Sequence, residues 1–250
     1  MPVIAVVISL HQCVQMIQEK VALVTGASRG IGKAVALGLA AEGYKIALVS
    51  RSENELSNLA NEISSITEAS IYAIDVAEEK LISATVKSVL NLWGRIDVLV
   101  NNAGLFELGK LDVPSSTLDR LYQINLRAPF CFMQEVLPGM QDRRAGHIFN
   151  IASISGIEGC SGYGAYASSK FGLVGLNEAL FKEVSKNGIK ITAICPSWVD
   201  TAMAQEANPP MDGKLMIQPT DIMKTLSWLL SLSSSASVAK VVINCSSTVS

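Results

Sequence analysis

Short apolar runs alternate with longer segments of mixed polarity along this chain. Seven of these runs have the length and β-branched content of strands: Val21–Thr25, Lys45–Ser50, Ser70–Ile74, Ile96–Val100, His147–Ile151, Ile189–Cys195 and Val238–Asn244. They lack regular polar alternation, which is typical of strands covered on both faces in a parallel sheet. The segments between them are long enough for crossover helices. The pattern therefore predicts an α/β protein with a doubly wound, seven-stranded parallel sheet and helices on both faces, a Rossmann fold.

The same pattern predicts one domain, because no linker rich in proline, glycine or serine divides the chain. We expect this domain to span residues 19–250 and to follow an N-terminal extension at residues 1–18. The extension opens with "MPVIAVVISL", which is too short for a transmembrane helix and lacks the basic residue and cleavage site of a signal peptide. Export is therefore not expected, and Met16 is a candidate for the natural start.

One segment breaks the rhythm of helices and strands. The stretch "QEANPPMDGKLMIQP" combines prolines, a glycine and methionines. We expect a substrate loop near residues 199–219, which is either a lid over a site or a plain surface connection.

Composition narrows the class of protein. The 250 residues carry a net charge of −2 and 49% are hydrophobic, so we expect a well-buried core and neither nucleic acid nor a membrane as a partner. The five cysteines are scattered singly, which favours free thiols in a reducing cytoplasm over disulfides. With only two histidines, no metal site is predicted.

The segment "VALVTGASRGIGKAVALGLA" is predicted to form a strand, a glycine turn and a helix. Gly26, Gly30 and Gly32 have the spacing G-x-x-x-G-x-G, which is neither G-x-G-x-x-G nor a P-loop. Missing side chains let the backbone approach a pyrophosphate, and the free N–H groups at a helix start favour an anion. A tight strand–helix turn also needs glycine. The position after the first strand of a doubly wound sheet favours nucleotide binding.

The end of the second predicted strand bears on which nucleotide binds. A site for NAD has an acid there to hold the ribose hydroxyls, whereas this chain has Ser50, Arg51 and Ser52. Arg29 in the glycine turn adds a second guanidinium, and two guanidiniums suit a 2′-phosphate. The sequence therefore favours NADP(H) over NAD(H), unless Arg51 is only an exposed residue at a helix entry.

The stretch "SGYGAYASSK" contains two tyrosines, and only Tyr166 has a lysine four residues later. About one helical turn separates Tyr166 from Lys170, so their side chains share a face if this segment is helical. On spacing alone, Tyr166 is either an ordinary helical aromatic or an acid whose proton is used in a reaction.

In chain order, these motifs resemble the short-chain dehydrogenase/reductase family, in its small single-domain branch. The matching elements are T-G-x-x-x-G-x-G at Thr25–Gly32, Asp75, "NNAG" at Asn101–Gly104, Asn125, Ser153 and Y-x-x-x-K at Tyr166–Lys170. Each element is common alone, but the ordered set is specific. The resemblance includes 3-oxoacyl-[acyl-carrier-protein] reductases and related carbonyl reductases. It implies hydride transfer between NADP(H) and a carbonyl or secondary alcohol.

The resemblance also implies a catalytic set and a cofactor site. The implied catalytic residues are Asn125, Ser153, Tyr166 and Lys170, and the implied cofactor-binding residues are Gly26, Ser28, Arg29, Gly30, Ile31, Gly32, Ser50, Arg51, Asp75, Val76, Asn102, Ala103, Gly104, Tyr166, Lys170, Pro196, Val199 and Thr201. Tyr166 would protonate the alkoxide formed from a ketone, and the Lys170 cation would lower the tyrosine pKa. Ser153 would bind the carbonyl oxygen, and Asn125 would link Lys170 to solvent through a water, unless it only kinks or caps a helix.

Other residues leave the substrate open. Ser197 stands where the family commonly has glycine, and Trp198 is equally a pocket wall or a core residue. Cys160 either faces the pocket or, as the favoured interpretation, is a buried thiol. The C-terminus "VVINCSSTVS" lacks the "DGG" ending of many acyl-carrier-protein reductases. An acidic carrier protein would need basic residues at the cleft mouth, for which Arg120, Arg127 and Arg143 are the candidates.

The expected partners are a small carbonyl or acyl-thioester substrate and further copies of this chain. Family members usually form dimers or tetramers through helices that correspond to residues 116–140 and 165–186. The alternative function is a non-catalytic NADP-binding regulator or scaffold with the same fold. The intact set of Asn125, Ser153, Tyr166 and Lys170 disfavours it.

Overall fold

The computed structural model describes residues 19–109 and 111–246, so the Met16 hypothesis lies outside the described residues. These residues form one parallel sheet of seven strands in the order β3-β2-β1-β4-β5-β6-β7, as the sequence pattern predicts. The strands are β1 (Val21–Thr25), β2 (Lys45–Ser50), β3 (Ala69–Ala73), β4 (Val98–Asn101), β5 (Gly146–Ile151), β6 (Ile189–Pro196) and β7 (Lys240–Ile243). β1 and β2 have their predicted bounds, and the other five strands differ from theirs by one or two residues at an end.

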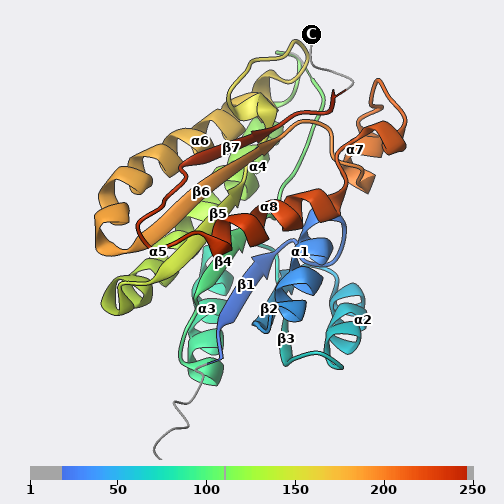
Figure 1. The fold of residues 1–250 in the computed structure, drawn as a ribbon. Coiled ribbons are helices and arrows are strands. Elements are labelled where there is room, and N and C mark those ends of the chain that lie inside the picture. Colours follow the sequence, from blue (N-terminus) through green and yellow to red (C-terminus); the bar gives the residue numbers. More distant parts are fainter. Residues whose placement is uncertain (1–18, 110, 247–250) are drawn as a thin grey trace, which may run out of the picture.

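Helices cover both faces of this sheet, so apolar side chains of alternate strand positions are buried on either side (Figure 1). One layer contains α1 (Gly30–Ala41), α2 (Glu53–Ile63) and α8 (Pro219–Ser231). The other contains α3 (Glu79–Trp93), α5 (Ala128–Arg143) and α6 (Gly164–Val184), with α4 (Ser115–Tyr122) leading into α5. Strands buried on both faces explain why their sequences show continuous apolar runs.

A π-helical turn at Gln123–Arg127 joins α4 to α5. The predicted helix over residues 116–140 is therefore continuous but locally widened, with Asn125 at the centre of the widened turn. Such turns often occur at functional sites.

The order of the strands places the loops after β1 and β4 side by side. β1 pairs with β2 on one side and with β4 on the other, so the chain direction across the sheet reverses here. Ligands of doubly wound proteins bind in the crevice outside the carboxyl ends of the strands at such a switch point.

A chain of buried amides crosses the middle of the sheet. Asn101 on β4 donates to Asn150 on β5 at 2.9 Å, and Asn150 donates to Asn177 on α6 at 3.0 Å. Asn177 in turn donates to the Ala239 carbonyl at 2.9 Å. These bonds join β4, β5, α6 and the segment before β7 through polar atoms that would be costly to bury unpaired.

The segment after β6 is less irregular than its sequence indicates. It holds the short helix α7 (Ala202–Glu206) and the 3-10 turn Gly213–Leu215, and its two ends meet in a bridge between Val199 and Ile217. The expectation of a substrate loop near residues 199–219 stays a prediction. No helix in the described part of the chain is long and apolar enough to cross a bilayer.

Candidate active site

A cavity of about 590 Å³ opens at the carboxyl ends of the strands. We divide it by the strands that contribute to it. The β1–β3 half is lined by the glycine turn, the ends of β2 and β3, and Arg120. The β5–β6 half is lined by residues after β5 and β6, by the start of α6, and by Phe106. Asn102, Ala103 and Gly104, which follow β4, lie between the halves.

The glycine turn of the β1–β3 half has a backbone that only glycine adopts easily. Gly26 and Gly30 have φ values of 63° and 55°. A Cβ on Gly26 would lie 2.8 Å from the Asn102 amide nitrogen. Gly32 supports the turn without lining the cavity, because a Cβ there would lie 2.1 Å from the Gly26 carbonyl oxygen. The turn therefore presents bare backbone and the start of α1 to a ligand.

Asn102 locks the turn against the end of β4. Its side-chain amide donates to the carbonyls of Thr25 and Gly26 at 2.9 and 3.1 Å. The Thr25 hydroxyl accepts from the backbone N–H groups of Asn102 and Ala103, both at 2.9 Å. "NNAG" is thus more than a strand-terminating turn, since it fixes the two loops of the switch point to each other.

Two cations of the β1–β3 half are available to a ligand. Arg29 and Arg51 are exposed, line the cavity and form no salt bridge with any described residue. The Ser50 hydroxyl beside them is buried and has no hydrogen-bond partner among the described residues. An orphaned hydroxyl next to two free guanidiniums fits a ligand that brings oxygen acceptors, such as a phosphorylated ribose.

Arg120 belongs to the same half but is already paired. Its guanidinium lies 2.6 Å from an Asp75 carboxylate oxygen, and the other Asp75 oxygen accepts from the Ala77 N–H at 2.9 Å. Partial burial raises the Asp75 pKa, but these two hydrogen bonds outweigh it and hold the pKa below its usual range. Asp75 is therefore an ionised, oriented acceptor in the cavity.

The β5–β6 half brings together Ser153, Tyr166 and Lys170, as predicted. Ser153 caps the 3-10 turn Ile154–Gly156 after β5, and its hydroxyl is hydrogen-bonded to Tyr166 on α6. The Lys170 ammonium lies 5.9 Å from the Tyr166 ring centroid and donates to the Ile151 carbonyl at 2.9 Å. Tyr166 and Lys170 are both buried, at 8% and 5% exposure.

The electrostatics of this pair differ from the sequence-based expectation. Burial raises the Tyr166 pKa to about 12, and the opposing influence is the Ser153 hydrogen bond rather than the lysine. Burial also lowers the Lys170 pKa to about 8. Burial thus sets the direction of both shifts, and the Tyr166 pKa is raised rather than lowered.

Asn125 does not line the cavity and makes no direct contact with solvent. It is fully buried, and its side chain accepts from the Leu105 N–H and donates to the Leu105 carbonyl, both at 2.8 Å. It also donates to the Ser169 hydroxyl at 3.0 Å. The alternative interpretation, a local helix distortion, describes its surroundings well, since it occupies the π-helical turn. Its side chain ties the loop after β4 to α6.

Apart from Gly32 and Asn125, every site residue predicted from the sequence lines this cavity: Gly26, Ser28, Arg29, Gly30, Ile31, Ser50, Arg51, Asp75, Val76, Asn102, Ala103, Gly104, Ser153, Tyr166, Lys170, Pro196, Val199 and Thr201. The Thr201 hydroxyl already accepts from the Ala204 N–H as the cap of α7.

Several lining residues were missed or misinterpreted. Phe106 and Met203 line the cavity, although no sequence signal beyond their place after strand ends marks them. Cys160 is exposed and lines the cavity, so its favoured interpretation as a buried thiol is wrong and the alternative that it faces the pocket is confirmed. Trp198 lines the cavity and also packs against the core, so both of its interpretations hold in part.

Comparisons with known proteins agree with this geometry. The short chain dehydrogenase family model matches residues 20–212. An uncharacterised oxidoreductase of Staphylococcus aureus is 32% identical over 229 residues, which is 91% of this chain and 98% of the relative. The chain therefore belongs to the short-chain dehydrogenase/reductase family of oxidoreductases.

Solved structures of this family are similar as well. A β-ketoacyl-[ACP] reductase of Bacteroides thetaiotaomicron has a TM-score of 0.82 at 34% identity, covering 92% of this chain and 98% of its own. A metagenomic short-chain oxidoreductase in complex with NADP has a TM-score of 0.80 at 31% identity, covering 91% and 97%.

Proposed function

We propose that this protein is an NADP(H)-dependent carbonyl reductase or alcohol dehydrogenase. It would transfer a hydride between the nicotinamide and the carbonyl or secondary alcohol carbon of its substrate. The observation that carries the proposal is the meeting of Ser153, Tyr166 and Lys170 in one cavity with the glycine turn. A phenol hydrogen-bonded to a hydroxyl, beside a buried ammonium, is a device for moving a proton at a carbonyl oxygen. A 3-oxoacyl thioester is one substrate that this chemistry accepts.

Ser153 and Tyr166 have distinct roles in the proposed reaction. The Ser153 hydroxyl hydrogen-bonds the carbonyl oxygen and orients it toward Tyr166. The Tyr166 hydroxyl gives its proton to that oxygen as negative charge develops there. A reduced nicotinamide cofactor, which the glycine turn and the residues after β4 would hold, would supply the hydride that the carbonyl carbon gains. One ketone, one hydride and one proton thus give one alcohol, while the reduced nicotinamide is oxidised.

The two pKa shifts suit the reductive direction. With a pKa of about 12, Tyr166 keeps its proton at neutral pH and is ready to donate it. With a pKa of about 8, Lys170 is still mostly charged at neutral pH and can stabilise the phenolate that is left. Asn125 acts in this proposal as a positioning residue, because it fixes the Leu105 backbone and the Ser169 hydroxyl on α6.

The preference for NADP(H) over NAD(H) is supported by the β1–β3 half. The free guanidiniums of Arg29 and Arg51 and the unpaired Ser50 hydroxyl suit a 2′-phosphate better than ribose hydroxyls. NADP in the similar metagenomic oxidoreductase agrees with this preference.

We also propose that the chain works as a homodimer or homotetramer in the cytoplasm. The support is the pair of exposed phenylalanines on the α5–α6 side, Phe130 at 45% and Phe171 at 44% exposure. The free thiols of Cys131, Cys160 and Cys195 suit a reducing compartment. Light scattering of the eluted protein would test the oligomer, and a single-chain mass would refute it.

The test of the function is a redox screen of the full chain. Ketones are offered with NADPH or NADH, secondary alcohols with NADP⁺ or NAD⁺, and nicotinamide absorbance is followed. We expect NADPH oxidation with at least one ketone and weaker turnover with NADH. Tight NADPH binding without turnover of any substrate would favour a non-catalytic regulator or scaffold instead.

A further inference from the structure

Charge is divided unevenly between the two halves of the cavity. Six described lining residues are charged: Arg29, Arg51, Glu55, Asp75, Arg120 and Lys170. All but Lys170 belong to the β1–β3 half, and the Lys170 ammonium is buried and bonded to the Ile151 carbonyl. The described lining of the β5–β6 half therefore holds no charged group that could select a charged substituent.

In place of charge, the β5–β6 half has an aromatic wall, which we define as Phe106, Tyr163 and Tyr166. The Phe106 ring lies edge-on to Tyr166 with 4.9 Å between centroids, and 5.6 Å from Tyr163. These separations are typical of favourable aromatic pairs. Phe106 and Tyr163 are only half-buried, so part of each ring remains open to a ligand.

The backbone holds this aromatic wall together. The Gly109 N–H donates to the Gly162 carbonyl at 2.9 Å, which joins the loop after β4 to the loop before α6. Phe106 is carried by the first loop and Tyr163 by the second. Because the rings are fixed by two paired loops, they form a preorganised surface for a flat apolar group.

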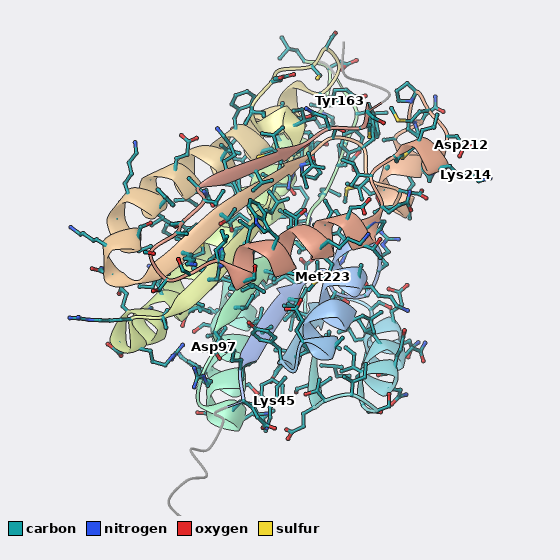
Figure 2. All side chains as sticks on the ribbon, viewed as in Figure 1. Lys45, Asp97, Tyr163, Asp212, Lys214 and Met223 are labelled. Atoms are coloured by element: carbon teal, nitrogen blue, oxygen red, sulfur yellow. The ribbon has the colours of Figure 1, made fainter. Side chains whose placement is uncertain are left out.

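The cations considered for an acidic carrier protein are engaged elsewhere. Arg120 pairs with Asp75, and Arg127 lies 2.5 Å from Glu79. Arg143 donates to the Ile96 carbonyl at 2.7 Å, next to Asp97, which Figure 2 shows at the end of the molecule opposite Tyr163. An acidic partner thus finds none of these three cations waiting at the mouth of the cavity.

The segment after β6 carries mostly negative charge. It contains three acids, Asp200, Glu206 and Asp212, and one described cation, Lys214. Figure 2 shows Asp212 and Lys214 on the outer loop at the end of the molecule that also holds Tyr163. An acidic carrier that approached over this loop would meet like charge.

We infer that the substrate is an uncharged ketone bearing an aryl or similarly flat apolar group, which packs on the aromatic wall, rather than an anionic or carrier-bound thioester. The inference rests on the proposed function and narrows its substrate class. The carbonyl faces Ser153 and Tyr166, and the flat group lies against Phe106.

A matched pair of thioesters tests the charge part of the inference. S-Acetoacetyl-N-acetylcysteamine and acetoacetyl-CoA share the reacting group, but only the second carries phosphates. With the full chain and NADPH, we expect kcat/KM for the neutral thioester to equal or exceed that for the CoA thioester. We also expect an aryl alkyl ketone to be preferred by about tenfold over a dialkyl ketone of equal size. A clear preference for acetoacetyl-CoA would overturn the inference.

Substitutions at Phe106 test the aromatic part. Phe106→Ala should lower kcat/KM by about tenfold for the aryl ketone and by less than about threefold for the dialkyl ketone. Phe106→Leu, which keeps the apolar volume, should lose the aryl preference and little else. Trp228→Ala removes a half-exposed aromatic ring on α8 outside the cavity and should change neither value. Equal losses for both ketones in both Phe106 variants would overturn the inference.

The failure of the inference differs from failure of the proposed function. If no carbonyl is reduced with either nicotinamide, the proposed function falls and the inference with it. If ketones are reduced with the opposite selectivity, only the inference falls. NADPH fluorescence on binding confirms that each variant is folded, since Phe106 lies away from the β1–β3 half.

Discussion

The two halves of the cavity are built on different principles. The β1–β3 half offers a ligand the bare backbone of the glycine turn and the start of α1. It also has exposed cations around an unpaired Ser50 hydroxyl. The β5–β6 half buries its ionisable groups, Tyr166 and Lys170, behind aromatic rings. The first arrangement suits a ligand of constant shape and charge, such as a nucleotide. The second suits chemistry on an apolar substrate, because low polarity strengthens the electrostatic interactions at the reacting atoms.

The largest expected effect separates chemistry from binding. Tyr166→Phe removes the proton donor and keeps the ring, so kcat should fall by about a thousandfold while NADPH binding is retained. Steady-state kinetics and NADPH fluorescence measure the two effects. Tyr122→Phe, on the surface of α4, is the matched control and should behave as the wild type. Comparable turnover by Tyr166→Phe would exclude the proposed role of Tyr166.

Burial of Lys170 should make the stability of the folded protein depend on pH. The folded-state pKa of Lys170 is about 8, below its ordinary value of 10.5, so the unfolded chain binds more protons between these values. Stability of the wild type therefore rises with pH across this window, and burying the charge costs about 3 kcal/mol near neutral pH.

Lys170→Met removes that cost but leaves the Ile151 carbonyl unpaired, at about 1 kcal/mol. The variant should thus be more stable by about 2 kcal/mol near pH 7, with the advantage vanishing near pH 10. Urea unfolding of the cofactor-free protein at both pH values measures this. A difference that does not change with pH would show that the lysine is not held charged in a dehydrated site.

A smaller effect is expected in the β1–β3 half. Arg51→Gln removes one of the two free guanidiniums, and a charge-assisted hydrogen bond contributes about 1.5–3 kcal/mol. KM for NADPH should rise by about tenfold or more, while KM for NADH and the limiting kcat stay nearly constant. Arg127→Gln, whose cation pairs with Glu79 outside the cavity, serves as the control. An equal rise of KM for both cofactors would argue against contact with a 2′-phosphate.

The smallest effect concerns Cys160, the exposed thiol of the β5–β6 half. Cys160→Ser should change kcat/KM by less than about threefold, since the thiol has no part in the proposed chemistry. Alkylation of the wild type with N-ethylmaleimide should nevertheless lower turnover by filling that half, and Cys160→Ser should resist it. If alkylation abolished NADPH binding instead, the two halves would not be independent.

Much of this site could be predicted because its elements leave local marks. The glycine turn and the Tyr166–Lys170 spacing are consequences of a strand end and of helix periodicity, which a sequence displays directly. Asp75 and "NNAG" were added by the resemblance to the family. The pKa values and the bonding partners of the site residues could not be predicted, since they depend on burial by segments distant in the sequence. Burial therefore raises the Tyr166 pKa, and the Asn125 side chain is bonded to Leu105 and Ser169.

The aromatic wall was missed for a related reason. Phe106 and Tyr163 belong to loops that are more than fifty residues apart in the chain, and the Gly109–Gly162 backbone bond joins these loops. A loop leaves no periodic signal, so neither ring was marked as a neighbour of the other. Cys160 was misjudged in the same loop, because average thiol burial says nothing about one particular turn.

The buried chain of Asn101, Asn150 and Asn177 has a consequence for how accurately the catalytic groups are held. Sliding β5 by one position against β4 would turn Asn150 toward the opposite layer of helices and break its hydrogen bonds to Asn101 and Asn177. The same slip would carry Ser153 by about 3.3 Å along the strand direction, beyond reach of the phenol. Hydrogen bonds buried far inside the sheet thus fix the strand register that brings the Ser153 and Tyr166 hydroxyls together. A fold with a shifted register loses these bonds and is less stable.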